Sequence, residues 1–301
     1  MAYLEEAKTP RKKVTIGYIL EKKAKGEKLS RTALYDYPMA VLAEEAGIEI
    51  INMGDSIANI TFGYASTTKA DLDIMIEHAK AVRKGAPSAF IMGDMPFMTY
   101  QASIAEAVHN AGRYIREADM DCVKIEGGLE IVPVIEALTK AGIPVIAHTG
   151  LTPQSALMLG GFKAQGRSAE LALKLIEVVA AFEEAGAIAV VIEAVPAEVG
   201  KIIYERSSIP ILGTGCGPYS DSPMINWYDM LGFYEHNPKF VKKYADIRSV
   251  ILEAAGRFIK ECQDGTYPGP EHSYKMMAGE EEKLLNLLAE KDKDQKEIQI
   301  I

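Results

Sequence analysis

Short apolar runs alternate along this chain with longer stretches in which apolar and polar residues recur at helical spacing. Six runs rich in Val, Ile and Ala predict buried strands, over residues 48–53, 88–92, 122–125, 144–148, 187–192 and 210–212. Apolar residues three and four positions apart predict helices between them, over residues 69–84, 102–117, 129–140 and 168–184. Strand and helix therefore follow one another in a regular order.

Several predicted helices end in an Ala-Gly pair directly before the next strand. The pairs are Ala46-Gly47, Ala141-Gly142 and Ala185-Gly186, and glycine in this place is typical of a left-handed helix C-cap. A strand, a helix and an Ala-Gly pair repeated this often predict parallel strands joined by right-handed crossovers.

Two parallel architectures fit this rhythm, a closed (β/α)8 barrel and an open doubly wound sheet. A seventh strand is indicated near residues 32–35, and an eighth only weakly. The open sheet would carry a glycine-rich nucleotide loop after its first strand, where this chain has Asp36-Tyr37-Pro38. We therefore predict a (β/α)8 TIM barrel over residues 1–270, with an N-terminal helical segment. From Gly279 the composition becomes charged, so residues 271–301 are predicted to be a helical tail that is solvated or packs in an oligomer.

Composition excludes several classes of protein. The chain has 301 residues, 48% of them hydrophobic, and a formal net charge of −9, which favours a globular enzyme and argues against a nucleic-acid partner. Its three cysteines are too few and too scattered for a disulfide framework. No apolar run is long enough to span a membrane, and no secretory signal is evident. We expect a cytoplasmic protein that binds no membrane.

Polar residues end five successive predicted strands, at Asp55-Ser56, Asp94, Lys124 with Glu126, His148 and Glu193. A single acidic residue after a strand is more often a turn former or a helix N-cap. In a parallel barrel, however, the C-terminal ends of the strands meet at one mouth, where the active site lies. Five such strand ends with three kinds of side chain favour a catalytic site over a set of caps.

The side chains at these strand ends suggest a reaction class. Asp55, Asp94 and Glu126 offer the carboxylate oxygens that Mg²⁺ prefers, and a 2-oxo acid chelated there would have its carbonyl polarised. Lys124 would balance the charge of the developing enolate, and Glu193 would remove a proton from the carbon beside the carbonyl. His148 is either a hydrogen-bond donor to the substrate or a satisfied polar residue at its strand end. Proton abstraction followed by carbon–carbon bond formation is the chemistry indicated.

Six longer motifs resemble the ketopantoate hydroxymethyltransferase (3-methyl-2-oxobutanoate hydroxymethyltransferase) family. They occur in the family's order between about Thr32 and His272, which is nearly the whole predicted core: YDYPMAVLAEEAGIEIINMGDS, GAPSAFIMGDMPFMTY, VKIEGG, PVIAHTGLTPQS, GGFKAQGR and IEAVP. The resemblance implies a (β/α)8 barrel of the phosphoenolpyruvate mutase/isocitrate lyase superfamily, in a homo-oligomer that is typically decameric. It also implies hydroxymethyl transfer from 5,10-methylenetetrahydrofolate to 2-oxoisovalerate (3-methyl-2-oxobutanoate), giving ketopantoate (2-dehydropantoate) on the route to pantothenate and coenzyme A.

The same resemblance implies roles for individual residues. Asp55 and Asp94 match the magnesium ligands, and Glu126 matches the third acidic residue of the metal site. Ser56 and Lys124 match positions that hold the 2-oxo acid together with the two aspartates. The remaining matches are Glu193, the general base, and Tyr35 and His148, which are further active-site positions.

This chain departs from the family pattern in the loops. Asp221 and Asp229 are kept. Ser222-Pro223 replaces the Gly-Gln that is usual in the family, and Tyr228 replaces a histidine. Residues 57–59 and 64–67 differ as well. The leading prediction is a Mg²⁺-dependent hydroxymethyltransferase that acts on 2-oxoisovalerate. The altered loops add the hypothesis that the enolising machinery is retained while the range of oxo acids or the one-carbon donor differs. The alternatives are a related 2-oxo acid aldolase or C–C lyase that uses another aldehyde or one-carbon donor, and a non-catalytic homologue.

Overall fold

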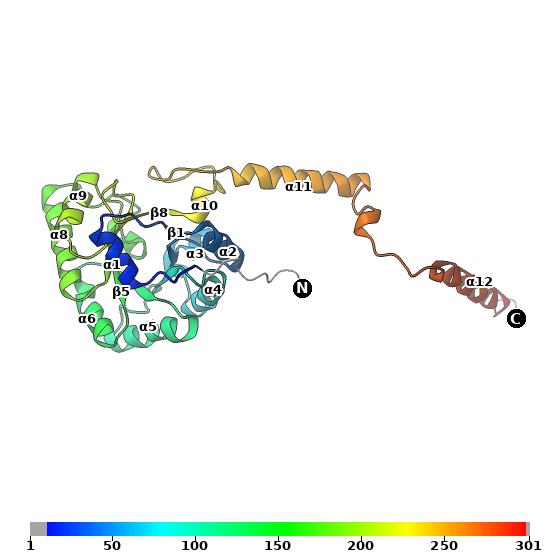
Figure 1. Ribbon diagram of the computed structural model, residues 1–301, viewed down its shortest axis with the longest axis horizontal. Helices are drawn as coiled ribbons and strands as arrows, with labels where there is room; N and C mark the ends of the chain where they lie inside the picture. The colour runs from blue at the N-terminus through cyan, green and yellow to red at the C-terminus, as the bar shows by residue number, and fades with distance from the viewer. Residues whose placement is uncertain (1–10, 299–301) are drawn as a thin grey trace. The chain divides into compact units, whose positions relative to one another are not determined.

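Eight parallel strands form a closed barrel in the order of the chain (Figure 1). The computed structural model describes residues 11–298. Each strand pairs with its sequence neighbours, and β1 pairs with β8 to close the ring. The predicted (β/α)8 barrel is therefore confirmed. The strands are β1 Arg31–Ala33, β2 Ile50–Met53, β3 Phe90–Asp94, β4 Cys122–Glu126, β5 Val145–Gly150, β6 Ala189–Glu193, β7 Ile211–Thr214 and β8 Ser222–Asn226.

Helices follow the strands and surround the barrel, as Figure 1 shows. In the first unit of the chain they are α1 Ile16–Ala24, α2 Tyr37–Ala46, α3 Ile57–Ile60, η1 Thr67–Lys69, α4 Leu72–Gly85, α5 Ile104–Ala118, η2 Leu129–Ile131, α6 Val132–Lys140, η3 Pro153–Ser155, α7 Ala156–Leu159, α8 Ala169–Glu184, α9 Ala197–Arg206 and α10 Trp227–Met230. The helix predicted over residues 129–140 is instead the 3₁₀ turn η2 followed by α6. The reason is Pro133, which lacks an N–H and is tolerated only in the first turn of a helix.

The three predicted Ala-Gly helix ends are confirmed. Gly47, Gly142 and Gly186 have φ angles of +88°, +79° and +95°, a region that favours glycine because it has no Cβ. Each glycine lets the chain reverse from an outer helix toward the next strand.

Of the eight strands, β8 is the one that the sequence predicts most weakly. It contains Pro223, which lacks a backbone N–H and is normally kept out of the interior of sheets. The strand forms because it lies between β7 and β1 and pairs with both: Leu212 is in register with Ser222, and Arg31 is in register with Met224. Closure of the barrel therefore overrides the weak local preference.

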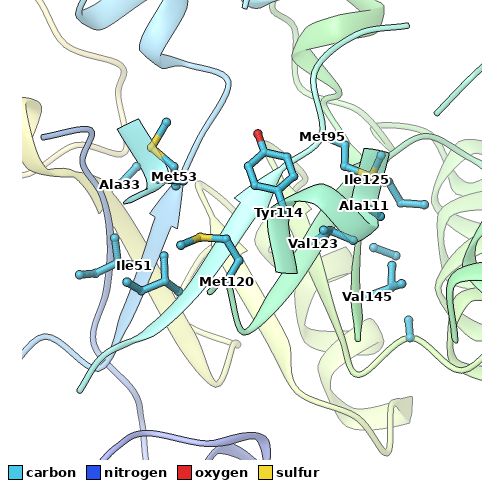
Figure 2. Packing of buried hydrophobic residues seen from close by; sticks show 14 of the residues in the cluster. Ala33, Ile51, Met53, Met95, Ala111, Tyr114, Met120, Val123, Ile125 and Val145 are labelled. Carbon is cyan, nitrogen blue, oxygen red and sulfur yellow. The ribbon is translucent and has the colours of Figure 1, made fainter. Parts of the chain in front are cut away.

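Two layers of apolar side chains hold the barrel together. The outer layer fills the space between strands and helices and includes Ile51, Val123 and Tyr114, which Figure 2 shows at close range. The inner layer fills the barrel itself, where Phe90 packs with other inward residues, and helix α1 contributes Ile19 to the same cluster. Helix α1, the predicted N-terminal helical segment, thus closes the N-terminal end of the barrel.

Contacts between Cα positions divide the chain into two compact units, Met1–Asp246 and Ile247–Ile301. The first unit contains the barrel. The second contains α11 Ile247–Asp264, η4 Pro270–His272 and α12 Glu280–Ile298, which is the helix expected in the charged tail. The domain boundary near residue 270 stays a prediction. No helix among residues 11–298 is both long and apolar enough to cross a membrane.

Candidate active site

Strand alternation explains how polar side chains reach the mouth of the barrel. On β4, Cys122 lies in the inner apolar cluster, while Lys124 and Glu126, two and four residues further along, face the C-terminal mouth. On β6, Val191 belongs to the same apolar cluster and Glu193 ends the strand. Because side chains two residues apart point to the same face of a strand, each strand supplies first the apolar floor and then the polar mouth.

A cavity of about 210 Å³ opens among these side chains. Of the eight residues predicted for the site, six line this cavity: Asp55, Ser56, Asp94, Lys124, His148 and Glu193. The other two, Tyr35 and Glu126, lie behind the wall and contact residues that line it. The structure therefore brings all eight together, although they come from six separate segments between β1 and β6.

Lys124 is the centre of the charged cluster. Its Nζ atom lies 2.9 Å from Asp94 Oδ2 and 3.6 Å from Glu126 Oε2. The side chain is buried, and burial by itself would lower the pKa of the ammonium group. The carboxylates of Asp94, Asp55 and Glu126 outweigh that effect and raise the pKa of Lys124 above its ordinary value. Lys124 is therefore a permanent cation at the floor of the cavity.

The three buried carboxyl groups carry more negative charge than one lysine balances. Burial raises the pKa of Asp55 to about 8, helped by the charges of Glu126 and Asp94 and opposed by Lys124. Burial also raises the pKa of Asp94. The pKa of Glu126 is lowered, because His148 and Lys124 outweigh its burial. One further cation would relieve the excess charge on the aspartates.

Gln154, from the turn η3, holds two of the acidic side chains in place. Its Nε2 donates to Asp55 Oδ2 at 2.8 Å, and its backbone N–H donates to Glu126 Oε1 at 2.7 Å. Tyr100 in turn donates its hydroxyl to Gln154 Oε1 at 3.0 Å. Sequence reasoning assigned no role to either residue, although Gln154 lies in the HTGLTPQS motif that carried the resemblance.

A hydrogen-bonded chain joins three strand ends at the other side of the cavity. Asn226 Nδ2 donates to the Tyr35 hydroxyl at 2.6 Å, and that hydroxyl shares a hydrogen bond of 2.8 Å with Ser56 Oγ. Tyr228 stacks on the Tyr35 ring, with 5.9 Å between centroids. Tyr35 thus orients Ser56 from behind the cavity wall.

His148 lies between the lysine cluster and Glu193. Its Nδ1 is 3.2 Å from Glu126 Oε2 and 3.3 Å from Lys124 Nζ, and its Nε2 is 3.5 Å from Glu193 Oε2. Burial raises the pKa of the Glu193 carboxyl, opposed by His148 and Lys124. A carboxylate with a raised pKa is a stronger base.

The backbone around Glu193 is unusually tight. A Cβ on Gly150 would lie 2.4 Å from the Glu193 carbonyl oxygen, and Gly150 has a φ of +92°. Ala194, directly after Glu193, has a φ of +47°, which is uncommon for a residue with a side chain. Such strained positions often occur at functional sites, and here they set the direction in which Glu193 leaves β6.

The donor set fits a divalent cation held by two carboxylates. Asp94 Oδ1 is buried and has no hydrogen-bond partner among the described residues, and Asp55 and Asp94 both face the cavity. Among residues 11–298, no three His, Cys, Asp or Glu side chains are grouped so that they could hold a metal ion. Mg²⁺ does not need three, because it commonly binds through one or two carboxylates and completes its shell with waters and substrate oxygens.

The segments that depart from the family pattern contribute to both the cavity and the scaffold. The retained Asp229 lines the cavity, whereas the retained Asp221 directly precedes β8, accepts the backbone N–H of Ile211 in β7 at 2.8 Å and pairs with Lys23 at 3.2 Å. The Tyr228 hydroxyl donates to Asp36 at 2.5 Å. The loop after β2 adds Asn59, Ile60 and Thr67 to the cavity lining.

Comparison with known proteins identifies one family. Residues 13–270 match the family model described as ketopantoate hydroxymethyltransferase. A 3-methyl-2-oxobutanoate hydroxymethyltransferase of Heliobacterium modesticaldum is 45% identical over 88% of this chain and 96% of that protein. Proteins of the same name from Syntrophobacter fumaroxidans and Enterococcus faecalis are 43% and 45% identical, over 91% and 88% of this chain and 98% and 96% of those proteins.

Solved structures share the fold at much lower identity. A phosphonopyruvate hydrolase in complex with oxalate and Mg²⁺ is 14% identical with a TM-score of 0.57, covering 94% of this chain and 98% of that one. A 2,3-dimethylmalate lyase, described as a member of the PEP mutase/isocitrate lyase superfamily, is 16% identical with a TM-score of 0.54, covering 95% and 99%. At these identities the likeness concerns the barrel alone.

Proposed function

The chain belongs to the ketopantoate hydroxymethyltransferase family of enzymes, and on that premise we propose that it transfers a hydroxymethyl group from 5,10-methylenetetrahydrofolate to 3-methyl-2-oxobutanoate. The product would be 2-dehydropantoate, a precursor of pantothenate. One observation carries the proposal: Glu193 lines the same cavity as the buried Lys124–Asp94 pair. A base thus faces a charged cluster suited to a 2-oxo acid.

The head of the 2-oxo acid would bind at the β2–β4 side of the cavity. Asp55 and Asp94 would hold Mg²⁺, and Glu126 would support them from behind the wall as the third acidic residue of the metal site. Bound Mg²⁺ would act as a Lewis acid on the keto oxygen and make the neighbouring carbon more acidic.

Two further side chains would bind the acid, and Tyr35 would orient one of them. The Lys124 ammonium would sit beside the oxygen that becomes negative as the enolate forms, where a fixed charge in a buried site stabilises it most. The Ser56 hydroxyl, held by Tyr35, would donate to the substrate carboxylate.

Glu193 would remove the proton from C3 of the substrate. Its raised pKa suits a base that works near neutral pH. His148, whose Nε2 lies 3.5 Å from Glu193 Oε2, would hold the carboxylate in position between proton transfers. The enolate carbon would then attack the methylene carbon of the folate. As the carbon–carbon bond forms, the two C–N bonds of that carbon would break in turn, tetrahydrofolate would leave with the proton taken from C3, and water would supply the hydroxyl group of the product.

A second cavity gives room for the one-carbon donor beside the mouth. It has a volume of about 290 Å³ and shares Pro153 with the site cavity. Its lining includes Leu157 and Phe162, which are 93% and 63% exposed. An apolar wall next to the reacting carbon is the setting that a flat aromatic donor such as a folate requires.

Cytoplasmic location and assembly into a homo-oligomer are part of the same proposal. Cys122, Cys216 and Cys262 are unpaired, which suits a reducing compartment.

Proton exchange is the sharpest test, because it leaves the donor out. The protein is incubated with 3-methyl-2-oxobutanoate in D₂O, with Mg²⁺ or with EDTA, and loss of the C3 proton is followed by NMR. We expect exchange with Mg²⁺ only. Adding 5,10-methylenetetrahydrofolate should then produce 2-dehydropantoate, detected by mass spectrometry. Product formed with free formaldehyde but not with the folate would favour the aldolase alternative, and absence of exchange in a folded, Mg²⁺-binding protein would contradict the proposal.

A further inference from the structure

Arg31 is a buried cation on the wall of the active-site cavity that the proposed reaction does not use. It lies on β1 and is only 4% exposed. Its side chain reaches to β7, where Nη2 donates to the Gly213 carbonyl at 3.0 Å and to Thr214 Oγ1 at 3.1 Å. These two bonds fix the guanidinium group at the mouth of the barrel.

The rest of the guanidinium group has no partner. Nε and Nη1 are buried and make no hydrogen bond to any described residue. Burial lowers the pKa of Arg31 to about 10, so the group is still charged at neutral pH. A buried charged donor that stays unpaired is costly, and such groups in native proteins commonly await a ligand. Unpaired N–H donors on a buried cation favour an anionic oxygen ligand such as a carboxylate.

The two cations that line the cavity differ in what they contact. Lys124 lies on β4 and is neutralised by Asp94 at 2.9 Å. Arg31 lies on β1, and among the described residues its hydrogen bonds go to neutral oxygens of β7, while the carboxylates of Glu193 and Asp94 act on it from a longer distance. The cavity therefore has one occupied cationic position, at the β3–β4 side, and one open position, at the β7–β1 side.

The position of Glu193 sets the direction of the substrate between them. Thr214, which holds Arg31, is the register partner of Glu193 on the neighbouring strand. A 2-oxo acid with its keto group at Asp94 and Lys124 and its C3 at Glu193 extends its far end toward Arg31. Asn52 lines the same wall, and its Oδ1 is buried without a hydrogen-bond partner.

We propose that Arg31 binds a second carboxylate at the far end of the substrate, so that the enzyme also enolises dicarboxylic 2-oxo acids. This inference rests on the proposed function, since it assumes that the 2-oxo head binds at the β2–β4 side. It adds a substrate class, five-carbon or similar 2-oxo dicarboxylates, that a purely aliphatic pocket would reject.

The wild-type protein alone gives a first test. Deuterium exchange at C3 is compared for 2-oxoglutarate and 2-oxopentanoate, which have the same chain length and differ only in the distal carboxylate. We expect kcat/KM for exchange to be roughly 10–100-fold higher for 2-oxoglutarate, the usual effect of a hydrogen bond between charged groups. Equal rates, or a preference for 2-oxopentanoate, would overturn the inference.

Variants then assign the effect to Arg31. In Arg31→Met the ratio of the two kcat/KM values should fall by about tenfold or more, and Arg31→Lys should restore part of it. Met224→Leu is the matched control, because Met224 lines the same cavity in register with Arg31 and carries no charge. Calorimetric binding of 2-oxoglutarate to each variant, checked for folding by thermal unfolding, gives a readout independent of turnover. A ratio that is unchanged in folded Arg31→Met would refute the assignment.

The two proposals fail in distinguishable ways. If no 2-oxo acid exchanges in the wild type, the proposed function is wrong. If 3-methyl-2-oxobutanoate exchanges with Mg²⁺ but the distal carboxylate brings no advantage, only the role of Arg31 is wrong.

Discussion

The two ends of the barrel are built from the same strands and have opposite chemistry. At the N-terminal end, inward side chains such as Phe90 and Ile146 pack with Ile19 of α1 into a closed apolar cluster. At the C-terminal end, inward positions two to four residues further along the strands carry carboxylates, a lysine and an arginine around an open cavity. One end gains stability from burial, whereas the other buries charge at a cost.

This difference suggests that stability and chemistry are separable in this molecule. Apolar burial at the floor contributes about 1.5–3 kcal/mol for each large side chain. The free-energy cost of removing the charged cluster from water is offset only by its ion-pair and hydrogen-bond partners and by bound ligands. Substitutions at the mouth should therefore affect the reaction more than the fold, and those at the floor should do the reverse.

The largest effect should come from removing the base at the mouth. Glu193→Gln keeps the size of the side chain but cannot accept a proton, so we expect C3 exchange to fall by about 10²–10⁴-fold. The unfolding temperature should stay near that of the wild type. Glu198→Gln, on the exposed start of α9, is the matched control. A loss of exchange below tenfold would give the role of base to another residue.

The next largest effect should come from a substitution that leaves a cavity in the apolar cluster at the N-terminal end of the barrel. Phe90→Ala removes a side chain that is 1% exposed, and we expect it to lower the free energy of unfolding by about 3–5 kcal/mol. Exchange per folded molecule should change little. Urea unfolding measures the first quantity and NMR exchange the second. The control is Phe162→Ala, at a side chain that is 63% exposed, which should leave the free energy of unfolding unchanged. If Phe90→Ala lowered exchange per folded molecule as much as Glu193→Gln does, stability and chemistry would not be separable between the two ends.

A smaller effect should come from the residue that holds the acidic side chains. Gln154→Leu deletes the bond to Asp55 Oδ2 while keeping the backbone bond to Glu126. Such supporting contacts typically change metal affinity by about 10–100-fold, and we expect Mg²⁺ binding to weaken within that range in calorimetry. Gln165→Leu, whose amide bonds only to the Lys163 carbonyl, serves as the control. Unchanged Mg²⁺ affinity would mean that Asp55 needs no support.

The buried aspartate at the mouth should also make stability depend on pH. The pKa of Asp55 is about 8 in the fold, against an ordinary value of 3.8, so the folded protein keeps a proton there that the unfolded chain loses. This contribution to stability is fully present below about pH 4 and is lost as the pH rises through about 8. Asp55→Asn does not titrate and should flatten this dependence in EDTA. A wild type whose stability fell no more than that of Asp55→Asn between pH 5 and pH 8 would contradict it.

Mg²⁺ provides a check on the same carboxyl group. Because the ion binds only the deprotonated form, its stabilisation of the wild type should grow from about pH 6 to about pH 8. Thermal unfolding with and without Mg²⁺ measures the difference.

Much of the fold could be predicted because strand and helix patterns are local. The six apolar runs and the Ala-Gly helix ends depend only on neighbouring residues, and the structure has them within a few positions. The eighth strand could not be predicted with the same clarity, because Pro223 opposes it and only pairing with β7 and β1 stabilises it.

The candidate site divides in the same way. Asp94, Lys124 and Glu193 can be recognised from the sequence alone, because each is a polar residue that interrupts or ends an apolar run. Gln154 and Arg31 have no such signal: Gln154 lies in a loop, and Arg31 directly precedes the strand predicted over residues 32–35. Their roles come from side chains that meet across the barrel, at separations of 99 residues for Gln154 and Asp55 and 183 for Arg31 and Thr214.

The sequence by itself thus determined which strands alternate with which helices, the barrel class, the family, and the acidic and basic residues at the strand ends. Only the tertiary structure decided how these charges interact. It shows that Lys124 is paired with Asp94 while Arg31 is left with free donors, and that Asp55 holds its proton near neutral pH. The physical reason is that local pattern follows from backbone geometry over a few residues, whereas pairing and pKa depend on burial and on distances between residues that closure of the barrel brings together.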